Sequence, residues 1–144
     1  MELFEMLRQD HQKVRQLFSQ FDDMKEEPEK NRKALEKVFS TLQKELKTHM
    51  EGEERHFYPA LREAEETHSL VLEAFEEHHV VKLLMRELER IQLSEKWIAK
   101  LSVMKENVQH HLEEEEEELF EKAQQILDPE QTRKVGEQIA RMRH

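Results

Sequence analysis

Residues 35–58 read LEKVFSTLQKELKTHMEGEERHFY, and their apolar side chains recur at the three-and-four spacing of one face of an α-helix. These side chains are Leu35, Val38, Phe39, Leu42 and Leu46. The same face continues with two polar residues, His49 and Glu53. The stretch therefore predicts a long amphipathic helix whose buried face carries a histidine and a glutamate.

Three other stretches repeat this spacing, and short breaks separate the four. The expected helices span about residues 2–25, 30–65, 69–92 and 95–127, and a short C-terminal helix follows at about 129–142. Short connections require neighbouring helices to run antiparallel. The sequence thus predicts a single all-α domain over residues 1–144, an up-down-up-down antiparallel four-helix bundle with a short C-terminal fifth helix.

Capping residues mark three of the expected helix starts. Ser69 and Ser94 stand where the third and fourth helices begin, and a serine side chain there can accept a hydrogen bond from the first turn. Residues 128–131, DPEQ, have the order of a capping box, with proline at the first helical position. We therefore expect Ser69, Ser94 and Asp128 to be N-caps.

The composition excludes several classes of function. The 144 residues include 23 Lys and Arg against 33 Asp and Glu, a formal net charge of −10, which argues against binding nucleic acids or anionic membranes. The chain has no cysteine, so disulfides, thiolate metal sites and cysteine nucleophiles are excluded. No apolar stretch approaches the roughly 18 residues of a membrane span, and the charged first turn is unlike a secretory signal. We expect a cytoplasmic protein.

Each of the four expected helices carries one histidine in its apolar face, and two of them add a glutamate four residues later. The six residues are His11, His49, Glu53, His78, His111 and Glu115. Burial without a partner costs about 2–7 kcal/mol for a neutral polar group and more for a charge. Six such groups would cancel the roughly 5–15 kcal/mol stability of a typical domain. Metal coordination offsets this cost, because it neutralises carboxylates and uses imidazole lone pairs.

The register of the helices places the six residues in one layer. Two residues at the same height in an antiparallel pair are equally far from the turn between them. The midpoints between successive positions lie near residues 31, 64–65 and 95–96, within about two residues of the breaks between the helices. One layer of the bundle can therefore hold all six.

The two halves of the chain repeat one pattern. Residues 49–58 and 111–120 both read His-x-Glu-x-Glu-Glu-x-x-apolar-aromatic. A weaker match pairs residues 10–17 with residues 77–84. The halves look like copies of one helical hairpin, which implies a pseudo-twofold site with two equivalent metal positions.

With these motifs the sequence resembles the hemerythrin-like (HHE cation-binding) domain family over nearly the whole chain. The motifs are Asp10-His11, His49-x-x-x-Glu53-Glu54, Glu77-His78 and His111-x-x-x-Glu115-Glu116. The resemblance implies a non-haem di-iron site that is held by histidines, bridged by two carboxylates and open to a small diatomic ligand, dioxygen or nitric oxide. It implies as metal ligands His11, His49, Glu53, His78, His111 and Glu115, with the two glutamates as bridges.

The resemblance also sets the expected cofactors and function. Imidazole and carboxylate ligands without sulfur suit iron or manganese, so we expect two iron ions, with manganese or zinc as substitutes. We expect a protein that binds or senses a diatomic ligand or handles iron, rather than an enzyme, although an oxidase or peroxidase side activity stays open. The expected assembly is a monomer or weak dimer, and no protein partner is indicated.

The sequence departs from the oxygen-carrying hemerythrins at two positions. Those proteins place two histidines four residues apart on the third helix, whereas the positions four residues from His78 hold Ala74 and Lys82. Their fourth helix uses an aspartate five residues after its histidine, where this chain has Glu116. Metal binding is therefore expected, and reversible oxygen carriage is not.

Several residues have a second interpretation. His79 is an alternative to His78 as a ligand, since it has apolar neighbours on its own face. His56 and His110 would each add a ligand if they faced the site, and a surface position is the alternative. Tyr58 is interpreted as a core residue.

Two alternative functions also remain. Glu53-x-x-His56 and Glu76-x-x-His79 match the ligand spacing of ferritin-like di-iron carboxylate oxidases, peroxidases or iron-handling proteins. Such a site needs a buried glutamate on the first helix, and its apolar face has none. The second alternative is a metal-free structural or interaction bundle.

Overall fold

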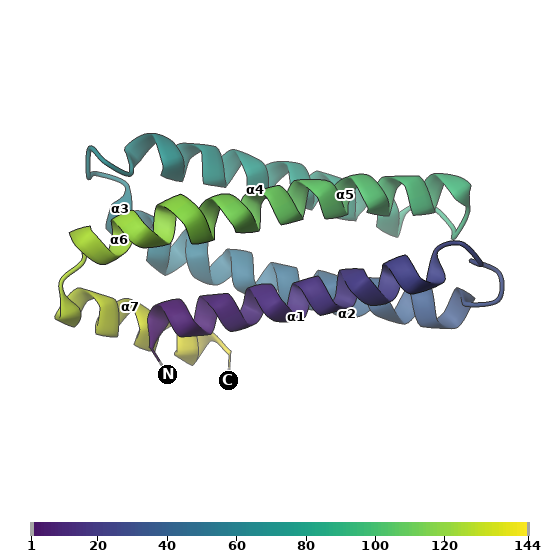
Figure 1. Cartoon of the computed structure of the whole chain (residues 1–144), viewed down its shortest axis with the longest axis horizontal. Coiled ribbons are helices and arrows are strands. Elements are labelled where there is room, and N and C mark those ends of the chain that lie inside the picture. The colour runs from purple at the N-terminus through teal and green to yellow at the C-terminus, as the bar shows by residue number, and fades with distance from the viewer. Residues whose placement is uncertain (1, 144) are drawn as a thin grey trace.

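Four helical stretches run the length of the molecule, each antiparallel to the next along the chain (Figure 1). The computed structural model describes residues 2–143, in which no strand occurs. The elements are α1 (Leu3–Met24), α2 (Arg32–Gly52), the π-helical turn η1 (Glu53–Phe57), α3 (Tyr58–Leu61), α4 (His68–Glu89), α5 (Glu95–Glu114), the π-helical turn η2 (Glu115–Leu119), α6 (Phe120–Ile126) and α7 (Pro129–Met142). The expected all-α bundle with a short C-terminal helix is confirmed.

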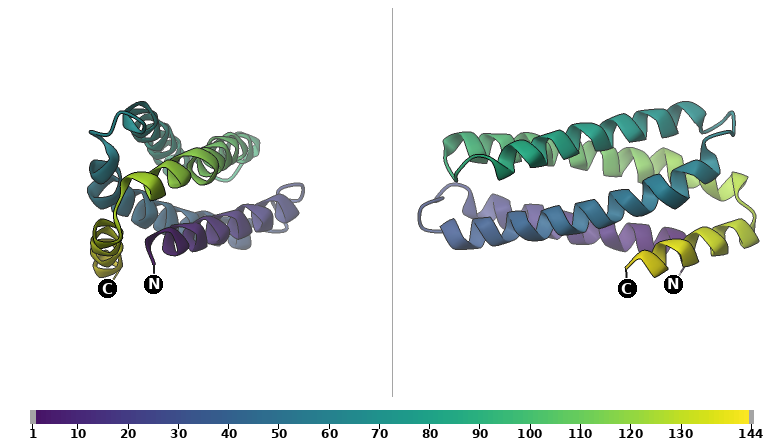
Figure 2. Two further views of the ribbon diagram at one scale, coloured as in Figure 1. Left: turned by 60° about the vertical axis from the view of Figure 1, so that its left-hand side comes forward. Right: turned by 180° about the vertical axis from the view of Figure 1, so that it is seen from behind.

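Two hairpins build the bundle. The first pairs α1 with α2, and the second pairs α4 with α5 (Figure 2). Two of the four stretches are composite, because η1 joins α2 to α3 and η2 joins α5 to α6 without a break. Within residues 2–143, no helix is long and apolar enough to span a membrane.

Apolar side chains fill the bundle on both sides of a polar layer. One cluster of buried residues surrounds Phe39 and Trp97, near the turns that join α1 to α2 and α4 to α5. The other cluster surrounds Phe4 and Phe57 and includes residues of α7. On α1, His11 lies between the residues of the two clusters and is fully buried. The polar layer is therefore shielded from water by apolar packing above and below it.

Both π-helical turns begin at a glutamate. The carbonyl of Glu53 accepts a hydrogen bond from the N–H of Tyr58, and the carbonyl of Glu115 accepts one from Phe120, each five residues later. A π turn accommodates one extra residue in a helix and is frequent at functional sites. Phe57 at the end of η1 and Tyr58 directly after it are both fully buried. A search for the 3.6-residue period does not reveal such a turn.

Two of the three expected N-caps are confirmed. The Ser94 hydroxyl accepts a hydrogen bond of 3.2 Å from the N–H of Trp97. Asp128 and Gln131 form the expected reciprocal capping box at the start of α7. The final helix is therefore fixed at its first turn by the residues that the sequence indicated.

The expected cap at Ser69 is wrong. Helix α4 begins one residue earlier, at His68, and Thr67 precedes it. The Thr67 hydroxyl is buried and donates a hydrogen bond of 2.6 Å to the carbonyl of Leu61. This bond links the start of α4 to the end of α3, six residues earlier, and helix-capping preferences alone do not predict it.

Candidate metal centre

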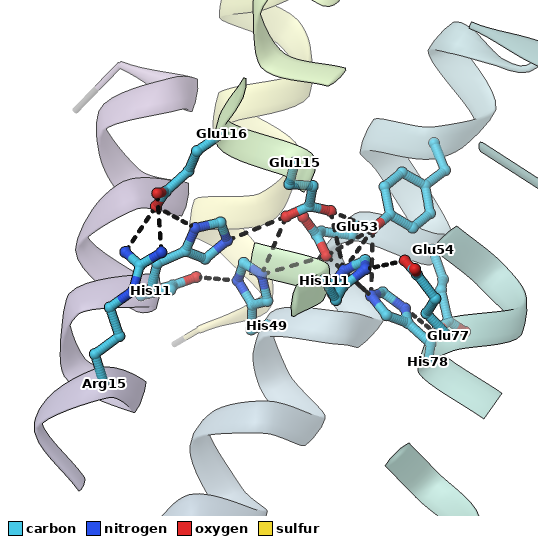
Figure 3. Close-up of polar contacts among 12 residues, drawn as sticks. His11, Arg15, His49, Glu53, Glu54, Glu77, His78, His111, Glu115 and Glu116 are labelled. Atoms are coloured by element: carbon cyan, nitrogen blue, oxygen red, sulfur yellow. Dashed lines mark hydrogen bonds and ion pairs between the residues drawn. The ribbon is translucent and has the colours of Figure 1, made fainter. Parts of the chain in front are cut away.

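The polar layer contains the six residues that the sequence singled out. Each is 0–5% exposed. They are His11 on α1, His49 on α2, Glu53 in η1, His78 on α4, His111 on α5 and Glu115 in η2. Their polar ends point toward one another from all four helical stretches (Figure 3).

The candidate ligand atoms of these residues form two overlapping groups, in each of which all atoms lie within 4.8 Å of one another. The groups are His11, His49, Glu53 and Glu115, and His78, His111, Glu53 and Glu115. Glu53 and Glu115 belong to both groups. Because a carboxylate has two oxygens, each glutamate has the donor atoms to serve both groups at once.

The Nε2 atoms of all four imidazoles face the two carboxylates. Each glutamate approaches one histidine from each half of the chain. The distances are 3.2 Å from Glu53 Oε1 to His49 and to His78, 3.1 Å from Glu115 Oε1 to His11, and 3.3 Å from Glu115 Oε2 to His111. The pseudo-twofold arrangement expected from the internal repeat is thus present in the positions of these atoms.

The Nδ1 atom of each imidazole points outward to a second set of carboxylates, which we call the outer carboxylates. The pairs are His11 with Glu116, His49 with Asp10, His78 with Glu54, and His111 with Glu77, at 2.6–2.7 Å. An Nδ1–H that donates to a carboxylate fixes the orientation of the ring and leaves Nε2 as the inward atom. All four rings therefore present the same nitrogen to the centre.

Three of the four outer carboxylates also pair with a cationic side chain. The pairs are Glu116 with Arg15, Glu54 with Lys82, and Asp10 with Arg143. Lys82 is one of the two positions four residues from His78, and it pairs with an outer carboxylate rather than facing the centre. Glu77 is the exception, since no lysine or arginine among residues 2–143 lies within 4 Å of it.

Protons balance the charges of the layer in the absence of a metal. Burial lowers the pKa of His49, but attraction to Glu53 and the hydrogen bond to Asp10 outweigh burial and raise this pKa to about 10. Burial raises the pKa of Glu115, yet attraction to His111 holds it well below its usual range. Metal ions compete with protons for such nitrogens, because only the neutral imidazole is a ligand.

The residues present fit a pair of metal ions. His49 Nε2 and Glu53 Oε2 are buried in the layer without any hydrogen-bond partner. Leaving such a group unsatisfied costs about 1–3 kcal/mol. Four imidazole nitrogens and two carboxylates, without sulfur, are a donor set suited to iron, manganese or zinc. A bound cation would satisfy both unpaired atoms.

Tyr58 is a polar member of the layer that sequence reasoning assigned to the core. Its hydroxyl lies 3.2 Å from His78 Nε2 and 3.4 Å from His111 Nε2. The same hydroxyl lies 3.0 Å from Glu53 Oε1 and is hydrogen-bonded to Glu115. Burial and the two neighbouring carboxylates raise the pKa of Tyr58 well above its usual range. All four candidate ligand residues of the group that contains His78 and His111 therefore contact this oxygen.

The other half of the repeat has Phe120 at the position of Tyr58. The Phe120 ring stacks on His11, with ring centroids 5.6 Å apart and planes inclined by 17°. The group that contains His11 and His49 therefore has no equivalent hydroxyl. The alignment of residues 49–58 with 111–120 could have drawn attention to the Tyr58 hydroxyl, because Phe120 at the equivalent position lacks that oxygen.

The remaining candidate residues lie outside the layer. His79 is exposed, so His78 is the histidine of α4 that faces the centre. His56 is half-buried and belongs to neither group, and the side chain of His110 is 69% exposed. Glu76 is exposed as well, so the second glutamate-histidine pair of the ferritin-like alternative lies on the surface.

A family model of the hemerythrin HHE cation-binding domain matches residues 2–123. The chain belongs to the hemerythrin HHE cation-binding family. The matched segment of this hemerythrin domain contains all six residues of the polar layer and ends before α7. No curated protein and no solved structure matches the chain. The family expected from the sequence is confirmed, and the buried histidine–glutamate layer is a candidate for its cation-binding site.

The metal-free hemerythrin domain should lose stability as the pH rises. The pKa of His49 is about 10 in the folded chain, against about 6.5 when unfolded. The stabilisation from its proton is complete below about pH 6.5 and disappears as the pH rises through about 10. We expect the melting temperature of chelator-treated protein to fall between about pH 7 and 10. The metal-loaded protein should change less, because the metal replaces the proton. Both melting temperatures are measured by circular dichroism. The same decrease with pH in the metal-free and the metal-loaded protein would contradict this prediction.

Proposed function

We propose that this hemerythrin domain binds two iron ions side by side in the polar layer. One histidine pair, His11 and His49, holds one ion, and the pair on α4 and α5 holds the other. Glu53 and Glu115 bridge the two ions. The observation that supports this proposal most strongly is that each carboxylate faces one imidazole from each half of the chain.

The charge of the layer supports divalent cations. With neutral imidazoles, the two bridging carboxylates carry negative charge into a region that apolar side chains shield from water. The three paired outer carboxylates are neutralised locally by Arg15, Lys82 and Arg143. The net charge of the layer with neutral imidazoles is therefore negative, and bound cations would neutralise it.

Iron is the proposed metal, with manganese and zinc as substitutes, on the basis of the ligand types and the family resemblance. When bound, iron supplies the capacity to bind a small diatomic molecule, dioxygen or nitric oxide, and to change oxidation state. The chain's own residues orient the imidazoles through the outer carboxylates and exclude water with Phe57 and Phe120. We therefore propose a domain that binds or senses a diatomic ligand, or that handles iron.

Reversible oxygen carriage is not proposed. The two positions four residues from His78 hold Ala74, which has no donor atom in its side chain, and Lys82, which pairs with Glu54. Tyr58 places a hydroxyl beside His78 and His111. This side of the centre therefore lacks the second histidine that the oxygen carriers have on the third helix.

The two alternative functions have less support. The ferritin-like alternative needs a buried glutamate on the first helix, and the buried residues of α1 are apolar apart from His11. The metal-free scaffold leaves two buried atoms, His49 Nε2 and Glu53 Oε2, without a partner and offers no compensation for them. Both alternatives remain distinguishable by experiment.

Metal-free protein incubated anaerobically with ferrous iron and then freed of excess metal should retain about two iron atoms per chain, measured by mass spectrometry. His111→Ala should retain fewer, because one ion loses a ligand. The matched control is His79→Ala, an exposed histidine of the second hairpin, which should retain about two. An iron content near zero in the unmodified chain would refute the proposal. Full retention in both His11→Ala and His111→Ala would favour the ferritin-like alternative.

The variant Tyr58→Phe tests whether Tyr58 is a metal ligand or only a packing residue. We propose that the Tyr58 oxygen coordinates the ion held by His78 and His111, since a bound cation lowers the pKa of a coordinated group. Protein loaded with ferrous iron and then oxidised to the ferric state with ferricyanide, which takes up the electrons, should show visible absorption from phenolate-to-iron charge transfer. Tyr58→Phe should lose this band and still retain about two irons. Phe75→Leu alters the ring that contacts Tyr58 without removing a hydroxyl and should keep the band. A band that persists in Tyr58→Phe would contradict coordination.

A further inference from the structure

Helix α7 lies outside both halves of the internal repeat and outside the segment that the family model matches. It packs on the first hairpin, against α1, α2 and η1 (Figure 2). Its residues Val135 and Ile139 are buried, and a Cβ atom on Gly52 would lie 3.3 Å from Ile139 Cγ2. Gly52 directly precedes Glu53, one of the two proposed bridging residues. The helix therefore packs against the polar layer's own backbone.

Arg143, directly after the last turn of α7, reaches the candidate metal centre through one intermediate residue. Its Nη1 donates a hydrogen bond of 3.0 Å to Asp10 Oδ1, and its Nη2 donates one to Asp10 Oδ2. Asp10 Oδ2 also accepts the Nδ1–H of His49, at 2.7 Å. Two parallel bonds from a guanidinium fix the orientation of a carboxylate. A chain of contacts thus runs from the end of α7, through α1, to a candidate ligand on α2.

The internal repeat accounts for two other cations beside the outer carboxylates. Arg15 is aligned with Lys82, because residues 10–17 match residues 77–84. The carboxylates that they bind, Glu116 and Glu54, are aligned with each other in the other pair of matching segments. These two ion pairs are therefore one contact that the repeat makes twice, and each of the two groups of candidate ligands has one of them.

The remaining outer carboxylates, Asp10 and Glu77, are also equivalent in the repeat, but their surroundings differ. Asp10 holds His49 in the first group of candidate ligands, and Glu77 holds His111 in the second. Arg143 pairs with Asp10, whereas no lysine or arginine of the described chain lies within 4 Å of Glu77. Helix α7 thus gives the group that contains His49 a support that the other group lacks.

We infer that Arg143 is a positioning residue for His49, and that the docking of α7 and an ion bound by His11 and His49 stabilise each other. This inference rests on the proposed function. Carboxylates that hold a ligating imidazole orient its ring, and their loss costs about 10–100-fold in metal affinity. Arg143 acts on such a carboxylate rather than on the ring, so we expect about tenfold. Coupling between two binding events is reciprocal, so the ion favours docked α7 to the same degree.

The affinity for metal tests the positioning role. Co²⁺ is titrated into metal-free protein, and the dissociation constants of its two ions are measured from the visible absorption. Arg143→Ala should weaken one constant about tenfold and leave the other unchanged. Arg143→Lys keeps the charge and should recover part of the loss. The matched control is Arg141→Ala, which removes an exposed arginine of the same helix that pairs with Glu137 and should leave both constants unchanged.

The hydrogen bond of His49 provides a signature that a merely structural residue would not change. In metal-free protein, the Nδ1–H protons that bind carboxylates should resonate far downfield in the NMR spectrum, because such bonds are short and strong. Arg143→Ala should shift or broaden the signal of His49 and leave those of His78 and His111 in place. Arg141→Ala should leave all of these signals unchanged.

Hydrogen exchange tests the reciprocal effect on α7. Loading the unmodified chain with Co²⁺ should slow the exchange of the amide protons of α7 about tenfold, since their exchange reports the local opening of this helix. The same loading should leave the exchange of α7 unchanged in Arg143→Ala and slow it in Arg141→Ala.

Two results would overturn the inference. One is that Arg143→Ala binds both ions as the unmodified chain does, and the other is that it weakens both constants equally, as a general loss of stability would. In either case two bound ions would still support the proposed function. If the centre binds no ion, the proposed function fails, and the NMR signal of His49 alone decides the positioning role.

Discussion

Two carboxylates, Glu53 and Glu115, lie in the middle of an apolar bundle, and each faces an imidazole from both hairpins. Burying these groups is unfavourable unless each charge has a partner. Successive shells of side chains around the two carboxylates supply these partners. The imidazoles face the carboxylates, the outer carboxylates accept the Nδ1 protons, and three cationic side chains neutralise them. What is left unsatisfied, at His49 Nε2 and Glu53 Oε2, lies where a metal would bind.

The two halves of the repeat that form this layer differ in two ways, and both differences lie beside the candidate metal centre. Tyr58 places a hydroxyl beside one histidine pair, whereas Phe120 stacks against His11 of the other pair. Helix α7 packs against the first hairpin, with Ile139 close to Gly52, whereas no helix among residues 2–143 packs in the corresponding place on the second hairpin. The repeat thus provides two similar groups of candidate ligands, and its departures give the two groups different surroundings.

The fold class, the family and the membership of the polar layer followed from the sequence, because apolar periodicity and the register of antiparallel helices are local or nearly local properties. The same reasoning left His78 and His79 unresolved until burial separated them. It missed the two π turns, since residues 49, 53 and 57, and residues 111, 115 and 119, keep a four-residue spacing that is also typical of an α-helix. It also missed the role of the Tyr58 hydroxyl, whose direction depends on that turn. The contact of Arg143 with Asp10 spans almost the whole chain and has no local signal.

The most direct test of the dinuclear centre is a crystal structure of the iron-loaded protein with anomalous scattering data at the iron absorption edge. The account predicts two anomalous peaks within the polar layer, one beside His11 and His49 and one beside His78 and His111. Glu53 and Glu115 should lie between the peaks and contact both. A single peak, or iron bound only outside the layer, would contradict the account.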